Sequence, residues 1–523
     1  MTTVTDHGPA ADAIDARRWA AVLSRRVQPA APSLAFVTLV LLLAVGGHVH
    51  RPWFDEAQAW LIARDASPWT LLAHAVRYEG SPGLWHLLLQ AAQRLGLPFK
   101  GLWLVSSCLS ALGAWLVLFR SPFPIALRIG LAFSYFFAFQ YAVVARSYAL
   151  DAALLPLIAT LFPGRGRAPV SYAALLGLLA NCNAHSFIIS VPLAVEFAWT
   201  LRGDLSARRA GAAAALALCG LLGLAAALQA WPPADISSPS GHRSFSLLRA
   251  ALLASEAVVD RLDIFSMQPP TGWSRLGGLA VTAAVITPIG LLSAAAGRAR
   301  LFCGVLAAFL GFTAVQFGNL WHSGVLWLAL LMLAWISWEG RSRAPAWRQR
   351  WLIGGLAVAV LCQDVATAKA WFREIGKPYS GAPAGAEALK VRLLAHPLET
   401  VAGLGDRSFG VQPWFARNLF ANYRGGAAGP AYYVWSRTGS PPFTPMPRAW
   451  DAVLASGYDW VVVGDLNLLA PDKRAAFYRI SAARSYCLKA AFPGAINWKG
   501  YSEEPDTLVL YGRCAARWAI ATR

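Results

Sequence analysis

Residues 32–65 read PSLAFVTLVLLLAVGGHVHRPWFDEAQAWLIARD, an apolar run followed closely by two adjacent carboxylates, Asp55 and Glu56. The apolar run predicts a membrane-spanning helix, and the acidic pair stands where that helix leaves the bilayer. Carboxylates at a membrane boundary are costly unless they cap a helix, pair or react. One interpretation is structural, with Asp55 capping the next helix and Glu56 favouring its N-terminal dipole. The other places both residues in a functional site.

The composition of the whole chain is that of a polytopic helical membrane protein. Of the 523 residues, 57% are hydrophobic and 14% are charged, and the mean hydropathy is +0.46. These values exclude a large soluble core. The net charge of +19 does not indicate nucleic acid, because the arginines stand in short clusters between apolar runs. We therefore expect membrane lipids, and no nucleic acid, as partners of the basic residues.

About eleven apolar runs are long enough to span a membrane, or nearly so. They cover 32–48, 101–119, 122–143, 147–163, 168–182, 185–201, 208–230, 276–296, 301–318, 323–338 and 351–368. A further run, 84–97, is shorter and has polar residues along one face, which predicts an amphipathic helix lying in the membrane plane. With the N-terminus inside, this assignment places the basic clusters in inner loops, as the positive-inside rule requires.

This topology divides the chain into three regions. Residues 1–31 are expected to form a cytoplasmic tail. Residues 32–368 form the transmembrane domain, with outer loops 49–100 and 231–275, and residues 369–523 form a periplasmic α/β domain. Apolar residues from Leu247 onward recur at helical spacing and predict a second surface helix.

Within the last region, Trp460–Val463 and Thr507–Tyr511 are predicted strands, and PDKRAAFYRISAA (471–483) is a predicted helix. Cys487 and Cys514 also lie in this region. An oxidising periplasm permits a disulfide between them, and the sequence leaves open whether they are bridged.

Most of the unusual polar residues fall on the predicted outer face. VARSYALDAALLPL carries Arg146 and Asp151, NCNAHS carries His185, and GNLWHSG carries His322. Taken singly, Asp151 fits a helix N-terminus, and a histidine at a helix end is more often an interfacial hydrogen-bonding residue. Taken together, they predict a cationic, hydrogen-bonding surround for a lipid-linked phosphate. The candidate substrate-binding residues are Arg64, Arg146, His185, His242, Arg243 and His322.

The pattern resembles the membrane-embedded C-type glycosyltransferases (GT-C), including the lipid A aminoarabinose transferases and protein O-mannosyltransferases. The matching features are Asp55-Glu56 in the first outer loop, the turn Glu79-Gly80-Ser81-Pro82-Gly83, and Asp151 after an aromatic-rich turn. The resemblance covers roughly residues 32–200, and the remainder matches only as architecture. Where those families have Lys-Pro or His-Pro-Pro, this chain has Ser81-Pro82-Gly83. A lysine contact to the donor phosphate is therefore missing, and Arg146, Arg243 or His322 would have to replace it.

The resemblance implies an inner-membrane glycosyltransferase of a bacterial cell envelope that uses a polyprenyl-phosphate sugar. The acceptor would be a lipid, a glycan or a protein on the periplasmic side, and transfer would be by direct displacement. Such a reaction needs a carboxylate base and cations at the departing phosphate. Asp55 is the expected base, with Glu56 and Asp151 as orienting groups, and the sequence leaves open which of Asp55 and Glu56 points into the cavity. Asp55 and Asp151 are also candidate ligands for a divalent metal, whose presence the sequence leaves open.

Two other functions compete with this expectation. A secondary transporter or lipid flippase would line a path through the bilayer with intramembrane charges. No inverted repeat is evident, and the polar residues cluster at one face rather than at mid-depth, which disfavours that reading. A membrane-anchored scaffold would leave Asp55 and Asp151 without a joint role.

Overall fold

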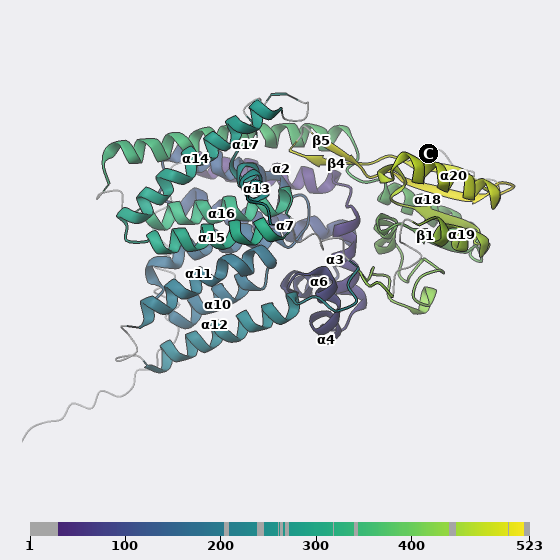
Figure 1. The fold of residues 1–523 in the computed structure, drawn as a ribbon, viewed down its shortest axis with the longest axis horizontal. Coiled ribbons are helices and arrows are strands. Elements are labelled where there is room, and N and C mark those ends of the chain that lie inside the picture. The colour runs from purple at the N-terminus through teal and green to yellow at the C-terminus, as the bar shows by residue number, and fades with distance from the viewer. Residues whose placement is uncertain are drawn as a thin grey trace, which may run out of the picture.

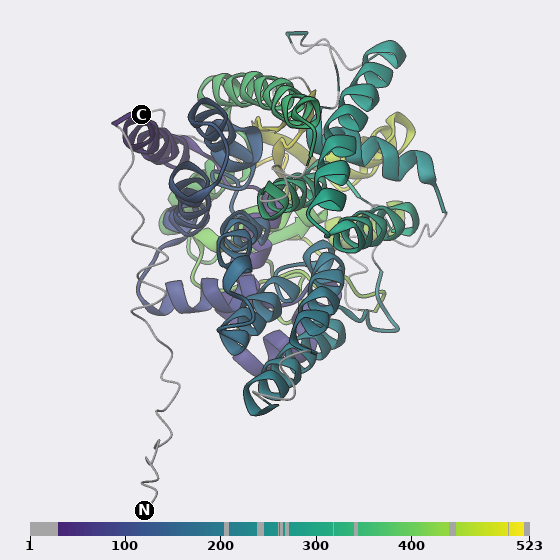
Figure 2. The ribbon, with the colours of Figure 1, turned by 90° about the vertical axis from the view of Figure 1, so that its left-hand side faces the viewer.

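The computed structural model describes residues 30–202, 209–237, 245–259, 261, 265–266, 271–316, 318–338, 344–438, 446–499 and 502–516. The chain forms a bundle of helices and a small domain with a β-sheet, which packs on one end of the bundle (Figure 1). We call this end the outer end, after the side of the membrane on which the sequence predicts the C-terminal domain. Turned by 90°, several helices of the bundle are seen end-on (Figure 2).

The helices of the bundle follow one another in chain order, joined mostly by short turns. They are α2 (Ala30–Val49), α7 (Leu102–Arg120), α8 (Ile125–Phe133), α9 (Tyr148–Leu161), α10 (Pro169–Ala180), α11 (Ala184–Leu201), α12 (Arg209–Ala230), α14 (Gly272–Ala295), α15 (Ala299–Val315), α16 (Leu320–Ser337) and α17 (Ala346–Gly376).

Six helices in the described ranges are long and apolar enough to cross a membrane, and four further apolar helices are shorter. The chain is thus a polytopic helical membrane protein, whereas the sequence predicted eleven spans. The expected span 122–143 is wrong as a single helix. It contains α8, a break at Ser134, and the π-helix η3 (Phe136–Gln140). At about 1.5 Å per residue, nine-residue α8 is far shorter than the roughly 30 Å of a bilayer core.

Burial differs sharply among the helices of the bundle. Residues 323–337 of α16 are all buried, as expected of a helix that is apolar on every side. At the periphery, α12 exposes Leu221 and Leu228 by 66% and 63%. Apolar side chains exposed in this way fit a surface that faces lipid rather than water.

Short helices occupy the two long loops at the outer end. The first loop contains α3 (Phe54–Asp65), α4 (Pro68–Thr70), the π-helix η1 (Leu71–Ala75), α5 (Val76–Glu79) and α6 (Leu84–Arg94). The eleven-residue α6 confirms a short helix within 84–97, but its polar residues His86 and Gln90 are buried together with Trp85 and Leu89, while Arg94 at its end is exposed. In the second loop α13 (Leu247–Val258) confirms the predicted helix.

The C-terminal domain is a four-stranded sheet covered by helices on both faces. Strand order is β1 (Val401–Leu404), β2 (Trp460–Val463), β6 (Leu508–Arg513) and β3 (Tyr486–Phe492). The β1–β2 pair is parallel and the other two pairs are antiparallel. The helices are α18 (Ala382–Ala395), α19 (Pro447–Ala455) and α20 (Pro471–Ala483), together with the 3₁₀ segment η7 (Asp406–Trp414).

Side chains alternate across this sheet with the period of two that a strand imposes. Val462 and Leu510 face α18 and η7, whereas Val461 and Val509 face α19 and α20. The predicted strand 460–463 and helix 471–483 are confirmed at both ends, and β6 confirms the predicted strand at 507–511 with a shift of one to two residues.

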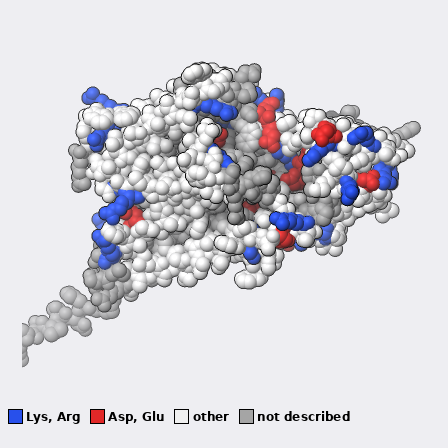
Figure 3. All heavy atoms as spheres, in the orientation of Figure 1, with Lys and Arg blue, Asp and Glu red and all other residues white. Residues whose placement is uncertain are grey.

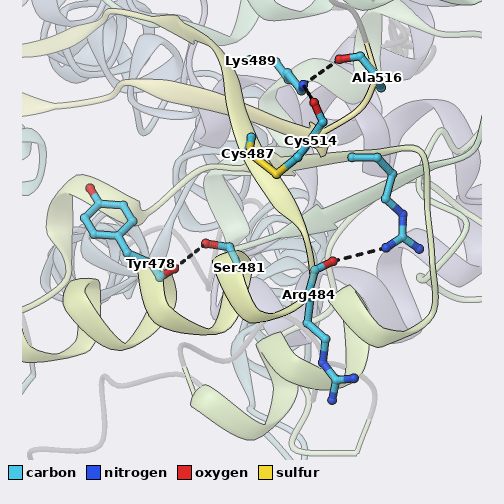
Figure 4. Close-up of a disulfide and its surroundings, with 8 residues drawn as sticks. Tyr478, Ser481, Arg484, Cys487, Lys489, Cys514 and Ala516 are labelled. Atoms are coloured by element: carbon cyan, nitrogen blue, oxygen red, sulfur yellow. Dashed lines mark hydrogen bonds between the residues drawn. A yellow bond between two sulfur atoms is a disulfide. The ribbon is translucent and has the colours of Figure 1, made fainter.

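A disulfide joins Cys487 at the start of β3 to Cys514 just after β6, with their Cα atoms 4.9 Å apart (Figure 4). Beside it, Lys489 Nζ donates to the carbonyl oxygens of Cys514 and Ala516. The question that the sequence left open is thus answered by a covalent link between neighbouring strands.

A hairpin of the C-terminal domain, β4 (Ala495–Trp498) and β5 (Ser502–Pro505), reaches into the helix bundle. The Trp498 ring packs on Trp321 at a centroid distance of 4.7 Å. Asn497 Nδ2 donates to the carbonyl of Ala370 at 2.9 Å, and the buried Lys499 donates to the carbonyl of Glu256 at 2.5 Å. The hairpin therefore fastens the sheet domain to the bundle through contacts with α16, α17 and α13.

Charged side chains divide the molecule along its long axis. Several of the visible Lys and Arg lie at the end of the bundle away from the sheet domain, a further group lies about midway along the bundle, and the sheet domain carries charges of both signs (Figure 3). At the basic end, Arg202 and Arg300 both lie over the Trp199 ring, and Arg165 and Arg298 lie over the Phe162 ring.

Candidate active site

The start of α3 places Asp55 and Glu56 in different surroundings. Glu56 is 1% exposed. Its Oε2 accepts a hydrogen bond from the backbone N–H of Trp53 at 3.1 Å, and its Oε1 accepts one from the backbone N–H of Ala145 at 2.8 Å. Glu56 therefore makes the capping interaction that the sequence offered to Asp55, and it ties α3 to the turn that carries Arg146.

Behind Glu56 lies a buried imidazole, His50, between two carboxylates. His50 Nε2 is 2.9 Å from Glu56 Oε2, and His50 Nδ1 is 2.8 Å from Glu374 Oε1 on α17. Burial by itself would lower the pKa of His50, but the two carboxylates outweigh it and raise the pKa to about 10. A charged His50 thus links α17 to the start of α3.

Asp55, by contrast, points into a partly open setting with a cation. Its Oδ2 lies 2.7 Å from Arg146 Nη1, and the two side chains are 25% and 21% exposed. Burial raises the pKa of Asp55, and the positive charges of Arg146 and Arg407 oppose that rise. A carboxylate with a raised pKa that keeps some exposure is suited to accept a proton.

Aromatic rings surround the guanidinium of Arg146. Its Cζ lies 4.7 Å from the Trp321 ring centre, 5.5 Å from that of Tyr148 and 5.9 Å from that of Trp53. These rings come from α16, α9 and the residue before α3, so three separate segments hold the cation in place. Contacts of this kind favour a fixed positive charge.

A second arginine reaches this cluster from the sheet domain. The guanidinium of Arg407, in η7, lies 5.9 Å from the centre of the Trp53 ring, which Arg146 also contacts. It is anchored by Asp506 at 3.1 Å, by Glu504, and by Asp465 at 3.7 Å. Sequence reasoning missed Arg407, because it follows a short strand far along the chain and belongs to no motif.

Glu79 provides a second carboxylate near Asp55. Its Oε1 accepts a hydrogen bond from Gln58 Nε2 at 2.8 Å. Gln58 also donates to the carbonyl of Tyr433 and accepts from the backbone N–H of Tyr433. Burial raises the pKa of Glu79 to about 7; the hydrogen bond from Gln58 opposes this rise, and the charge of Asp55 adds to it. From the sequence, Glu79 was considered only as part of the turn that supports the family resemblance, and it was not predicted as a site residue.

Asp151 lies fully buried between α9 and α11. One carboxylate oxygen accepts a hydrogen bond from Asn183 Nδ2 at 2.6 Å, and the other accepts one from Ser186 Oγ. Asn183 also caps α11 by accepting from the backbone N–H of Ser186 at 3.0 Å. These bonds give Asp151 a helix-linking role, and they do not bring it to Asp55.

The two predicted histidines do meet, although their turns are far apart in the sequence. The rings of His185 and His322 lie 4.3 Å apart, and His322 is 5.7 Å from the Tyr148 ring that faces Arg146. His322 Nδ1 accepts from the backbone N–H of Asn319 at 3.0 Å. The histidines therefore reach the Asp55–Arg146 pair through the Tyr148 and Trp321 rings, both of which contact His322 and Arg146.

The remaining predicted binding residues lie elsewhere. Arg64, at the other end of α3, pairs with Asp65 at 2.6 Å and donates to the carbonyl of Phe415 at 2.7 Å. Its role there is to join α3 to the sheet domain. His242 and Arg243 lie outside the described residues.

The divalent ion considered from the sequence does not fit the residues present. Both oxygens of Asp151 are engaged by Asn183 and Ser186, so this carboxylate is not available to share an ion with Asp55. Across the described ranges, no group of three or more His, Cys, Asp or Glu side chains is arranged to hold a metal.

The candidate active site thus consists of Asp55 and Glu79 as carboxylates, Arg146 and Arg407 as cations, and an aromatic wall that includes Trp53. It lies where the outer end of the bundle meets the sheet domain. No protein-family model matches the chain, and no curated protein matches it.

Proposed function

We propose that the chain is a glycosyltransferase of the bacterial inner membrane, which moves a sugar from a polyprenyl phosphate to an acceptor on the periplasmic side. The observation that carries this proposal is the Asp55–Arg146 pair, a partly exposed carboxylate 2.7 Å from a caged cation at the outer end of a membrane-embedded bundle. Glu79 adds a second carboxyl group, and Arg407 adds a second positive charge.

The proposed reaction needs one base and one site for an anionic leaving group. The acceptor hydroxyl oxygen bonds to the anomeric carbon while its proton passes to Asp55. The bond between that carbon and the phosphate oxygen breaks, and its electron pair leaves with the polyprenyl phosphate. Arg146 and Arg407 stabilise the negative charge that grows on this phosphate.

The other groups have supporting roles in this scheme. Glu56 holds the turn before Arg146 through the N–H of Ala145, so it is a positioning residue. Glu79, whose pKa is about 7, can accept a hydrogen bond from a sugar hydroxyl when ionised or donate one when protonated. The rings of Trp53 and Trp321 offer flat apolar faces beside the cation.

The position of the site at one end of the bundle suits a lipid-linked substrate. A polyprenyl chain can remain among the membrane helices while its phosphate lies at the outer end. The gathering of arginines at the opposite end supports a cytoplasmic location for that end under the positive-inside rule. The sheet domain would then be periplasmic.

The test is transfer by purified protein in detergent, with a panel of radiolabelled polyprenyl-phosphate sugars and an extract of envelope lipids, glycans and proteins as acceptors. We expect one donor to yield a labelled product in which a new glycosidic bond has formed. Asp55→Asn should abolish the product, and Asp65→Asn, at the far end of the same helix, should retain it. If no donor yields product but labelled lipid crosses proteoliposome membranes, the chain is a transporter instead.

A further inference from the structure

A separate cavity of about 650 Å³ lies at the outer ends of α2, α7 and α17. Its wall includes the side chains of Arg51, Lys100, Trp103, Ile375, Lys377 and Trp414. Asp55, Glu79, Arg146 and Arg407 do not line it, so it is distinct from the candidate active site. We call it the basic cavity.

Three cations from three different segments meet in the basic cavity. Arg51 follows α2, Lys100 precedes α7, and Lys377 follows α17, and all three side chains are exposed. Lys100 Nζ lies 5.6 Å from the Trp414 ring centre, and Lys377 Nζ lies 3.2 Å from Oε1 of Glu503, which does not line the cavity. Glu374 is the one carboxylate among the described lining residues, and it is bonded to His50. Cations collected in a concave site favour an anionic ligand.

Apolar side chains continue from the basic cavity down the outside of the bundle. Ile375 lines the cavity and is 65% exposed, and Phe372, one turn earlier on α17, is 78% exposed. On the neighbouring helix α2, Val45 is 52% exposed. A ligand that satisfies both parts of this surface has an anionic head and a long apolar chain.

The shape of the cavity is built into the packing of α2. A Cβ atom on Gly47 would lie 2.0 Å from the Trp103 ring, and one on Gly46 would lie 2.2 Å from the Trp371 ring. Only glycine at these two positions lets both indoles rest directly on the helix backbone. Trp103 thereby forms a cavity wall at the depth where Trp side chains concentrate in membrane proteins.

We propose that the basic cavity binds the phosphate of an anionic glycerophospholipid from the leaflet beside the sheet domain. Arg51, Lys100 and Lys377 contact the phosphate oxygens, and an acyl chain lies along α17 over Ile375 and Phe372. This site does not depend on the proposed glycosyl transfer, and its test uses no activity measurement.

The test measures retention of palmitoyl-oleoyl-phosphatidylglycerol by the full-length protein in detergent, using native mass spectrometry over a lipid titration. The double variant Arg51→Gln/Lys100→Gln should bind about 30-fold more weakly, since each cation near a lipid phosphate contributes on the order of 1 kcal/mol. The matched control is Lys473→Gln/Arg479→Gln, which removes the same charges from exposed positions on α20. It should bind as the wild type does.

Further arms separate the possible outcomes. Arg51→Lys keeps the charge and should keep most of the binding, and equal thermal unfolding of all variants shows that they are folded. Equal retention by the wild type and the double variant would overturn the proposal, as would an equal loss in the α20 control. If inorganic phosphate displaces the lipid at equal concentration, the cavity is a site for free phosphate, and the lipid assignment is wrong.

Discussion

Asp55 and Glu56 show how one peptide bond can separate two roles. Glu56 is buried and accepts hydrogen bonds from two backbone N–H groups, so its carboxylate has a structural role. Asp55 keeps a quarter of its side-chain surface exposed and pairs with Arg146, and the charge of Arg407 also acts on it. A carboxylate that is already saturated with hydrogen bonds is a poor base, whereas one with a free lone pair beside a substrate can accept a proton. The sequence could not show which of the two side chains faces the site, because adjacent residues of a helix point in different directions and the orientation of the helix was not known.

At the residue scale, the first prediction concerns the base. Asp55→Asn should lower the rate of sugar transfer by about 10²–10⁴-fold, as expected when a general base is removed at constant size. The measurement is the initial rate with saturating donor, and Asp65→Asn provides the control. Glu56→Gln should instead lower thermal stability, because it weakens the bonds to Trp53 and Ala145. Near-normal transfer by Asp55→Asn at equal protein level would exclude Asp55 as the base.

The second prediction concerns the pH dependence that Arg407 confers. Asp55 must be ionised to act as a base, so kcat/KM should fall as the pH falls through its pKa. Because the positive charge of Arg407 lowers this pKa, Arg407→Gln should move the acidic limb of the profile to higher pH. Arg407→Lys should leave the limb close to its original position. An unchanged limb in Arg407→Gln would show that Arg407 does not act on Asp55.

Individual site residues could be predicted only where the neighbouring sequence made them stand out. Asp55 and Arg146 stand at the ends of apolar runs, and polar residues at such boundaries are conspicuous. Glu79 and Arg407 lie in segments of ordinary polarity, and only the packing of the sheet domain on the first outer loop brings Arg407 to Asp55. Asp151 was as conspicuous as Asp55, but its hydrogen-bond partners on α11 could not be read from the sequence.

At the scale of elements, His50 joins α17 to the start of α3 through two carboxylates. The pKa of His50 is about 10 in the folded protein and 6.5 without its surroundings, so folding favours the protonated form. This contribution to stability is complete below about pH 6.5 and is lost as the pH rises through about 10.

The third prediction follows from this arrangement. His50→Gln leaves two buried carboxylates without a counter-charge and should destabilise the protein by roughly 3–5 kcal/mol at pH 6. Thermal unfolding in detergent between pH 6 and pH 10 measures both the loss of stability and its pH dependence. The wild type should lose stability as the pH approaches 10, and the variant should lack the part of this loss that comes from deprotonation of His50. His48→Gln, two residues earlier and exposed, is the control. A melting temperature equal to that of the wild type would contradict the role given to His50.

Which elements could be predicted depends on how much context each one needs. Strand 460–463 and helix 471–483 carry complete local patterns, and both were found where expected. The run 122–143 was apolar throughout, and hydropathy alone cannot report the break at Ser134, whose N–H closes the end of α8 on the carbonyl of Leu131. Buried irregular backbone of this kind is tolerated because neighbouring helices satisfy it: the Ser106 and Ser107 hydroxyls both donate to the carbonyl of Ala142.

At the scale of the whole molecule, the fourth prediction is topological. If the basic end of the bundle faces the cytoplasm, the sheet domain is periplasmic. Alkaline phosphatase fused after Arg523 should then be active in cells, whereas a cytoplasmic reporter at that position should be silent. The reverse pattern would place the Asp55–Arg146 pair on the cytoplasmic side and remove the basis for a periplasmic acceptor.

The fifth prediction concerns the disulfide. Its cysteines are 27 residues apart, and closing a loop of this length stabilises a domain by about 3–4 kcal/mol. Cys487→Ser/Cys514→Ser should therefore lower the melting temperature of the sheet domain, which protease resistance at increasing temperature can follow. Thiol labelling of the unreduced wild type should leave both positions unmodified. Complete labelling at these positions would show that the bridge is absent in cells.

The order of strands in the sheet has a consequence for synthesis of the protein. The final strand, β6, lies between β2 and β3, and the hairpin just before it supplies Trp498 to the ring of Trp321 in the bundle. The ribosome must therefore complete β6, and this segment must reach the rest of the domain, before the sheet can close. A nascent chain that stops short of residue 508 would carry the described membrane helices yet lack the central strand of the sheet domain, to which Arg407 belongs. A stop codon just before Leu508 should accordingly be as damaging as one early in the chain.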